Sequence, residues 1–160
     1  GGAITTIDNQ NLLYNGKNYE QRGIIIASNN KDNHEEICSE IKGIIEKYNT
    51  GEADFEVPQR LLDLYEEKNY GQYGTDGKLH VCLLGSNHTT GGNSGSPALD
   101  AHGRLIGINF DRSWESTMSD MLFDKDICRN IMVDIRYVLW VIDIYAGAGH
   151  LVKEMNLVRN

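Results

Sequence analysis

Residues 90–97 read TGGNSGSP, a run that suits either a flexible surface loop or a rigid loop built to present one hydroxyl group. A β-prone segment, LHVCLLG, precedes it at 79–85. Two more follow it, PALD at 97–100 and RLIGINFD at 104–111, joined by the short turn 101–103. The run therefore lies between a predicted strand and a predicted β-hairpin.

Two common glycine-loop motifs do not fit this position. A phosphate-binding loop needs a helix directly after it and a lysine beside its Ser or Thr, whereas here Pro97 and β-prone residues follow. The nucleophile elbow G-x-S-x-G requires a glycine where this chain has Ser96. Both readings are set aside.

The nucleophile loop of chymotrypsin-fold serine peptidases, G-[D/N]-S-G-[G/S]-P, does match residues 92–97. Acyl transfer needs two backbone N–H groups aimed at the oxyanion, and those of Gly92 and Ser94 have the right spacing. Gly95 leaves room for the substrate chain, and Pro97 begins the next strand. The alternative is a purely structural turn.

The resemblance extends beyond the loop. The stretches 57–74, 88–116 and 126–155 are similar to the C-terminal part of the bacterial dipeptidyl-peptidases related to dipeptidyl-peptidase 7 and dipeptidyl-peptidase 11. This resemblance implies a mainly β, chymotrypsin-like barrel with flanking helices, of which residues 44–160 are the C-terminal part, ending in α-helices. Residues 1–43 are not placed by it.

The same resemblance assigns roles to individual residues. Ser94 matches the nucleophile, and Gly92 with Ser94 matches the oxyanion hole. Asp111 matches the acidic residue that holds the free α-amino group of the substrate, a contact that a charge-assisted hydrogen bond would make.

Arg112, in the stretch FDRSW, indicates specificity. The dipeptidyl-peptidase 7 type has glycine at this position, and the dipeptidyl-peptidase 11 type has an arginine that reads Asp or Glu before the scissile bond. The planar guanidinium can bind a carboxylate through two hydrogen bonds. The alternative is an Arg112 that only forms a salt bridge with a neighbouring Asp or Glu.

A serine nucleophile also needs a general base and an orienting carboxylate. The chain has five histidines, and none lies in the alanine-histidine-cysteine type of context that marks the base in this fold: His34, His80, His88, His102 and His150. We therefore expect a fragment whose partner is the N-terminal half of the same enzyme, and we expect the isolated chain to be inactive. An acidic-specific endopeptidase and a non-catalytic peptide-binding module stay open as alternatives.

The composition and charge of the chain limit the kinds of binding partner to be expected. The net charge is −8, and no cluster of Lys and Arg stands out, so nucleic-acid binding is not expected. No apolar run approaches the roughly 18 residues of a membrane helix, and no signal peptide is recognised at the first residues. Cys38, Cys82 and Cys128 are widely spaced and are expected to be buried thiols, with no metal site and no cofactor.

The resemblance implies a periplasmic, secreted or cell-surface protein of a Gram-negative bacterium, and a half-barrel with exposed apolar surface is expected to form a homodimer.

Periodicity predicts the remaining elements. Residues 3–28 read as two hairpins, and 35–48 as an amphipathic helix. A second helix begins at Pro58. The stretches 132–145 and 146–157 read as two helices separated by small residues.

Overall fold

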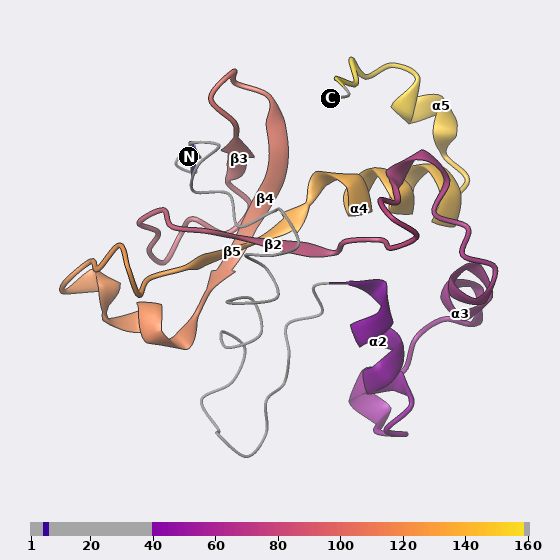
Figure 1. Ribbon diagram of the computed structural model, residues 1–160, viewed down its shortest axis with the longest axis horizontal. Helices are drawn as coiled ribbons and strands as arrows, with labels where there is room; N and C mark the ends of the chain where they lie inside the picture. The colour runs from indigo at the N-terminus through magenta and orange to yellow at the C-terminus, as the bar shows by residue number, and fades with distance from the viewer. Residues whose placement is uncertain (1–4, 7–39, 159–160) are drawn as a thin grey trace. The chain divides into compact units, whose positions relative to one another are not determined.

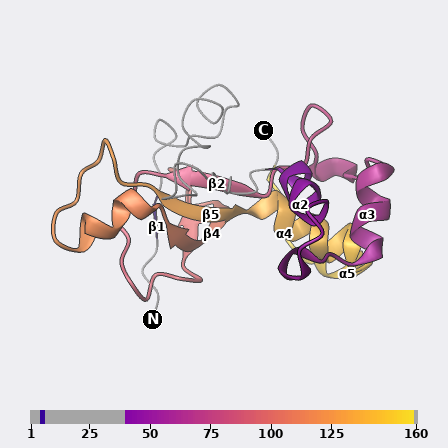
Figure 2. The ribbon, with the colours of Figure 1, turned by 90° about the horizontal axis from the view of Figure 1, so that it is seen from below.

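The computed structural model describes residues 5–6 and 40–158. They form two compact units, one containing residues 5–6 and 82–135 and the other containing residues 40–81 and 136–158. The hairpins predicted over 3–28 lie outside the described residues, apart from a two-residue strand. Figures 1 and 2 show the two units in perpendicular views.

The first unit is a five-stranded sheet in the order β1-β3-β4-β5-β2. Its strands are β1 (Thr5–Thr6), β2 (Cys82–Gly85), β3 (Pro97–Leu99), β4 (Leu105–Arg112) and β5 (Asn130–Asp134). The strands β3, β4, β5 and β2 pair antiparallel, and β1 is added at the edge in parallel with β3 (Figure 1). The prediction of a β structure accompanied by helices is confirmed, and the closed chymotrypsin-like barrel stays a prediction.

The strands predicted around the glycine loop are present, but one strand was missed. The helix predicted over 132–145 is wrong at its start, because residues 130–134 form β5, between β4 and β2. β5 is buried at nearly every position, so its sequence lacks the alternation of a half-exposed strand. A short, continuous apolar run of this kind cannot be told from a buried helix by periodicity alone.

The core of the sheet is small and tightly packed. Leu83, Ala98 and Met132 are buried together, and Ile106 packs against them. Gly107 is required by space, since a Cβ there would lie 2.8 Å from the carbonyl oxygen of Val133 on β5. Because β5 pairs with both β2 and β4, Asn130 lies opposite Gly85 and Arg112. The loop of interest runs from the end of β2 to the start of β3.

The second unit is helical. Its helices are α2 (Ile41–Tyr48), α3 (Gln59–Glu66), α4 (Ile135–Trp140), which follows β5 directly and continues as a π-helical turn, and α5 (Gly149–Val152). The helix predicted over 35–48 starts later than expected, because Glu40 is extended and pairs with His80. The helix predicted from Pro58 is confirmed within one residue, and of the stretch 146–157 only α5 is α-helical.

Buried polar contacts hold this second unit together. The indole N–H of the fully buried Trp140 donates to the carbonyl of Asn69 (2.9 Å), and the Tyr73 hydroxyl donates to Asp143 (2.7 Å). Among the described residues, no helix combines the length and the apolar character needed to cross a bilayer.

Candidate active site

The loop between β2 and β3, residues 86–96, is folded around Asn93. The Asn93 side-chain oxygen accepts a hydrogen bond from the N–H of Thr90 (2.8 Å), and the Asn93 N–H donates back to the Thr90 carbonyl (3.2 Å). The N–H of Ser96 donates to the Asn93 carbonyl (3.1 Å). Such side-chain contacts to nearby backbone are how asparagine stabilises tight turns. The loop is therefore an ordered turn, which we call the nucleophile loop.

Several N–H groups of this loop, including that of Gly91, have no acceptor in the described part of the chain. The N–H of Gly95 donates to the Asn109 carbonyl (2.7 Å), and that of Asn93 is used within the turn. The N–H groups of Gly92 and Ser94 have no acceptor among residues 5–6 and 40–158. Gly92 has φ +96°, and no atom lies within 4 Å of where its Cβ would be, so the backbone conformation and not space requires glycine. Two donors at this spacing can stabilise an oxyanion.

The Ser94 hydroxyl lies against the end of β4. Its Oγ donates to the carbonyl of Phe110 (3.2 Å), and Ser94 is exposed. The β4–β5 pairing shifts between Asn109 and Asp111, so Phe110 is the extra residue of a β-bulge. Bulges of this kind re-aim side chains next to functional sites. Here the bulge leaves Phe110 and Asp111 both exposed beside the serine.

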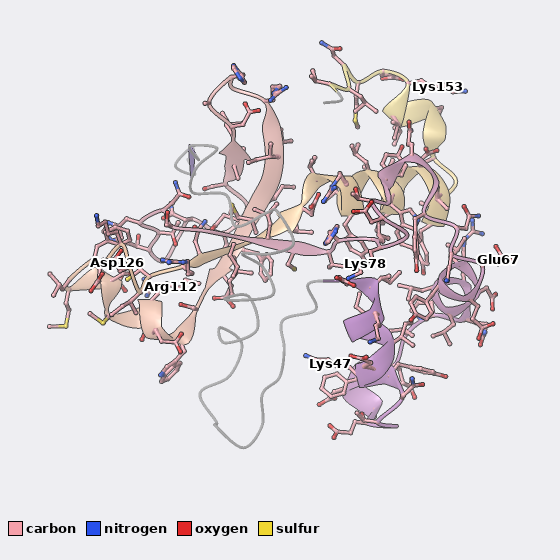
Figure 3. All side chains as sticks on the ribbon, in the orientation of Figure 1. Lys47, Glu67, Lys78, Arg112, Asp126 and Lys153 are labelled. Carbon is pink, nitrogen blue, oxygen red and sulfur yellow. The ribbon has the colours of Figure 1, made fainter. Side chains whose placement is uncertain are left out.

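Arg112 is held at the end of β4 by an ion pair with Asp120. Its Nη1 and Nη2 donate to the two carboxylate oxygens of Asp120 at 2.8 and 2.6 Å. Nη1 also lies within hydrogen-bond distance of the Thr89 carbonyl (3.1 Å) and the Ser119 hydroxyl (3.2 Å). Figure 3 labels Arg112 beside the helical turn Trp114–Asp120.

This ion pair stabilises the charged form of both partners. The hydrogen bond with Asp120 raises the pKa of Arg112, and the same bond lowers the pKa of Asp120. Nε of Arg112 has no acceptor within the described part of the chain, so one edge of the guanidinium remains available. The structure therefore contains the salt bridge of Arg112 that the sequence left as an alternative. This salt bridge leaves the Nε–H of Arg112 available to a second carboxylate.

Asp111 has one side-chain contact among the described residues, in which its carboxylate accepts from the N–H of Arg112 (2.8 Å). The carboxylate is exposed and lies one residue from the carbonyl that receives the Ser94 hydroxyl. Ser94, Asp111 and Arg112 are thus brought together around one bulge.

No general base accompanies the serine in the described part of the chain. Nε2 of His88 lies 3.0 Å from the Ser119 carbonyl, and its ring stacks on Phe123 at 4.9 Å. Within residues 5–6 and 40–158, the Ser94 side chain hydrogen-bonds to Phe110 and to no histidine, and His34 lies outside the described residues. Among the described residues, no group of His, Cys, Asp and Glu could hold a metal ion.

Two buried asparagines behind the loop were not singled out from the sequence. Asn109 on β4 is 3% exposed and Asn130 on β5 is 0% exposed, and the Asn130 amide donates to Oδ1 of Asn109 (2.8 Å). The available signal was an asparagine between apolar residues in INF and another directly before the apolar residues of NIMV. Asp120 was also missed, because nothing in the spacing of 112 and 120 marks them as partners.

Comparison with known proteins identifies the family. The model of the family Peptidase S46 matches residues 22–157. The chain is 64% identical over 118 residues to the Asp/Glu-specific dipeptidyl-peptidase of Flavobacterium psychrophilum, covering 74% of this chain and 16% of that protein. It is 46% identical over 117 residues to dipeptidyl-peptidase 7 of Porphyromonas gingivalis, covering 73% and 16%. The chain thus spans about one sixth of the length of these relatives.

A solved structure has a similar fold over most of this chain. The crystal structure of Porphyromonas endodontalis DPP11 superposes with a TM-score of 0.70 at 44% identity, covering 72% of this chain and 17% of that one. The same protein has been solved in complex with the dipeptides Arg-Asp and Arg-Glu.

Proposed function

The chain belongs to the peptidase S46 family, and from this premise we propose that it is the nucleophile-bearing part of a longer serine dipeptidyl-peptidase that cleaves after Asp or Glu. The observation that carries the proposal is that the N–H groups of Gly92 and Ser94 lie beside an exposed serine hydroxyl in an ordered loop and have no acceptor among the residues that the structure describes. An ordered loop that presents these two N–H groups beside an exposed serine hydroxyl offers both donors to one substrate carbonyl oxygen.

The chemistry follows from these groups. Ser94 Oγ attacks the carbonyl carbon of the second peptide bond while its proton passes to a histidine base. The oxyanion of the tetrahedral intermediate is stabilised by the N–H groups of Gly92 and Ser94. The C–N bond then breaks, the histidine returns the proton to the leaving amine, and water hydrolyses the acyl-enzyme. The histidine and its aspartate belong to the N-terminal half of the same enzyme, which we propose as the partner of this chain.

Asp111 and Arg112 supply the specificity. The exposed Asp111 carboxylate binds the α-amino group of the substrate. This contact fixes the substrate so that the peptide bond after its second residue lies at Ser94. The free Nε edge of Arg112 binds the Asp or Glu side chain, while Asp120 keeps the guanidinium in place. Truncation of one side of such a desolvated pair costs about 2–5 kcal/mol, or roughly 30- to several-thousand-fold in preference.

The specificity argument rests on Arg112, because overall identity does not separate the two types of relative. Asp/Glu-specific relatives are 64% and 62% identical to this chain in two species but 45% in Porphyromonas gingivalis. Relatives named dipeptidyl-peptidase 7 are 48% and 46% identical. A periplasmic location, a homodimer and a chymotrypsin-like barrel completed by the N-terminal half are further parts of this proposal.

The test is made on the full-length enzyme with reporter dipeptides X-Asp, X-Glu and X-Leu, each free and N-acetylated. Release from only the free X-Asp and X-Glu reporters is expected. Cleavage of acetylated reporters would indicate an acidic-specific endopeptidase and overturn the role of Asp111. Cleavage of X-Leu in preference would overturn the role of Arg112 while leaving Ser94 in place.

Two variants sharpen the result. Arg112→Gly is expected to lower kcat/KM for X-Asp and X-Glu with little change for X-Leu.

The isolated 160-residue chain is expected to be inactive. Turnover by this chain that is lost on Ser94→Ala would contradict the assignment of the base to another part of the enzyme. Peptide binding without turnover by the full-length enzyme would favour a non-catalytic binding module, the candidate suggested by the lack of a histidine beside Ser94 among the described residues.

A further inference from the structure

We propose that Asn109 and Asn130 are positioning residues that orient the Ser94 N–H, one of the two oxyanion donors, by holding the start of the nucleophile loop and the residue before Ser94 to the sheet. The inference rests on the proposed function, because it assigns the two amides to the chemistry of Ser94.

The two side chains form a continuous hydrogen-bonded chain. Nδ2 of Asn109 donates to the carbonyl of Asn93 (3.2 Å), and Nδ2 of Asn130 donates to Oδ1 of Asn109 (2.8 Å). Oδ1 of Asn130 accepts from the N–H of Asn87 (3.3 Å). Each amide therefore uses its nitrogen and its oxygen, which sets the orientation of both side chains. Asn87 lies at the start of the loop and Asn93 directly precedes Ser94, so the two amides join the start of the loop to the serine.

Asn109 contacts the loop on both sides of the nucleophile. Its carbonyl accepts from the N–H of Gly95 (2.7 Å), and its N–H donates to the carbonyl of Ser96 (2.9 Å). With the side-chain bond to Asn93, one residue of β4 holds the positions immediately before and after Ser94.

The bond to the Asn93 carbonyl acts directly on an oxyanion donor. The Asn93 C=O and the Ser94 N–H belong to one planar trans peptide unit, so they point in opposite directions. The Asn93 oxygen is held toward the sheet by the Asn109 amide and the Ser96 N–H. The Ser94 N–H must then point away from these donors, and no described residue accepts from it. Preorganisation of this kind lets a donor stabilise developing charge without reorganising during the reaction.

The surrounding backbone makes room for the amides. Asn130 lies opposite Gly85 on β2 and opposite Arg112 on β4. A Cβ on Gly85 would lie 2.6 Å from Oδ1 of Asn130, 2.8 Å from Oδ1 of Asn87 and 2.9 Å from Cε of Met132, so glycine makes room for the Asn130 amide and its neighbours. Burial of an amide is unfavourable unless its polar atoms are hydrogen-bonded, and an apolar residue would serve a purely structural strand as well. Two buried asparagines beside a glycine that accommodates them indicate a positional role.

The test replaces the amide donors with isosteric carboxyl groups in the full-length enzyme. Asn109→Asp and Asn130→Asp each keep the size of the side chain but lose the Nδ2 donor. We expect kcat to fall about 10- to 100-fold, less than for complete loss of an oxyanion donor, with KM changed less than about twofold. Asn156→Asp, at an exposed asparagine of the second unit, is the matched control and should retain the parent rate.

A second readout reports on the oxyanion hole. A peptidyl boronate forms a tetrahedral adduct with a serine nucleophile, and its affinity should fall in proportion to kcat, whereas affinity for the product dipeptide should not. All rates are taken per active site titrated with a phosphonate, so that loss of folded protein does not count as loss of kcat. Should Asn109→Asp yield no folded enzyme, Asn130→Ser decides by the same criteria.

An unchanged kcat per active site, or equal loss of boronate and dipeptide affinity, overturns this inference while leaving the proposed function intact. Activity that survives Ser94→Ala in the full-length enzyme overturns both this inference and the proposed function.

Discussion

Two glycine-containing loops flank β3, and they differ in what they do with their N–H groups. The turn after β3, Asp100–Arg104, is closed internally: Oδ1 of Asp100 accepts from the N–H groups of His102 (2.8 Å) and Arg104 (2.9 Å). The N–H of Gly103 donates to the Asp100 carbonyl (3.0 Å). The nucleophile loop before β3 leaves the N–H groups of Gly92 and Ser94 without acceptors among the described residues.

Both loops contain a glycine with positive φ, +96° at Gly92 and +76° at Gly103, and neither glycine is needed for space. Backbone conformation alone therefore does not distinguish a turn from a site. The difference is the position of the acidic or amide side chain. Asp100 accepts from the N–H groups of its own turn, whereas Asn93 accepts from the N–H of Thr90, and the Ser94 N–H has no acceptor among the described residues.

The largest expected difference between the two loops is in chemistry. In the full-length enzyme, Ser94→Ala should lower kcat by at least about 10⁴-fold, because it removes the attacking oxygen. His102→Ala, at the exposed centre of the other turn, should leave kcat unchanged, since only its backbone N–H is used. Steady-state hydrolysis of X-Asp reporters measures both. Retained turnover in Ser94→Ala would remove the distinction between the loops.

The two glycines provide a matched pair with a smaller effect. Gly92→Ala and Gly103→Ala should each destabilise the fold by about 1–2 kcal/mol, because both place a Cβ at positive φ. Only Gly92→Ala should also lower kcat, by up to about 10²- to 10³-fold, because it displaces an oxyanion donor. Thermal unfolding and kcat measured on the same preparations separate the two effects. An equal loss of kcat in both variants would mean that strain, and not the donor, is responsible.

The smallest effect concerns the acid stability of the closed turn. Burial opposes ionisation of Asp100, but its hydrogen bonds with Arg104 and the His102 N–H outweigh this and lower the pKa of Asp100. A lowered pKa in the folded state means that the carboxylate stabilises the protein above its unfolded pKa, near 4, and that this contribution is lost as pH falls through the lower folded value.

Asp100→Asn should therefore lower the melting temperature at pH 6 by a few degrees, and the gap from the parent protein should narrow below about pH 4. Calorimetry between pH 3 and 7 follows the gap, and kcat at neutral pH should not change. A gap that is the same at pH 3 and pH 6 would contradict a role for the Asp100 charge.

The sequence predicted the parts of the site that are close together along the chain. The strands on each side of the nucleophile loop, the helix after Pro58 and the match to the family all follow from local pattern. β5 was missed because a strand buried on nearly every side has no alternation to reveal it. The start of α2 was misplaced because pairing of Glu40 with His80, which is remote in sequence, overrides local helix propensity.

By itself, the sequence determined that Ser94 lies between two glycines in a loop between strands, because conformational freedom at glycine and β propensity are properties of neighbouring residues. Only the tertiary structure decided which N–H groups remain free, that Asp120 holds Arg112, and that Asn130 supports Asn109. These partners are 8 and 21 residues apart along the chain. They meet because of strand order and a β-bulge, which no local spacing encodes.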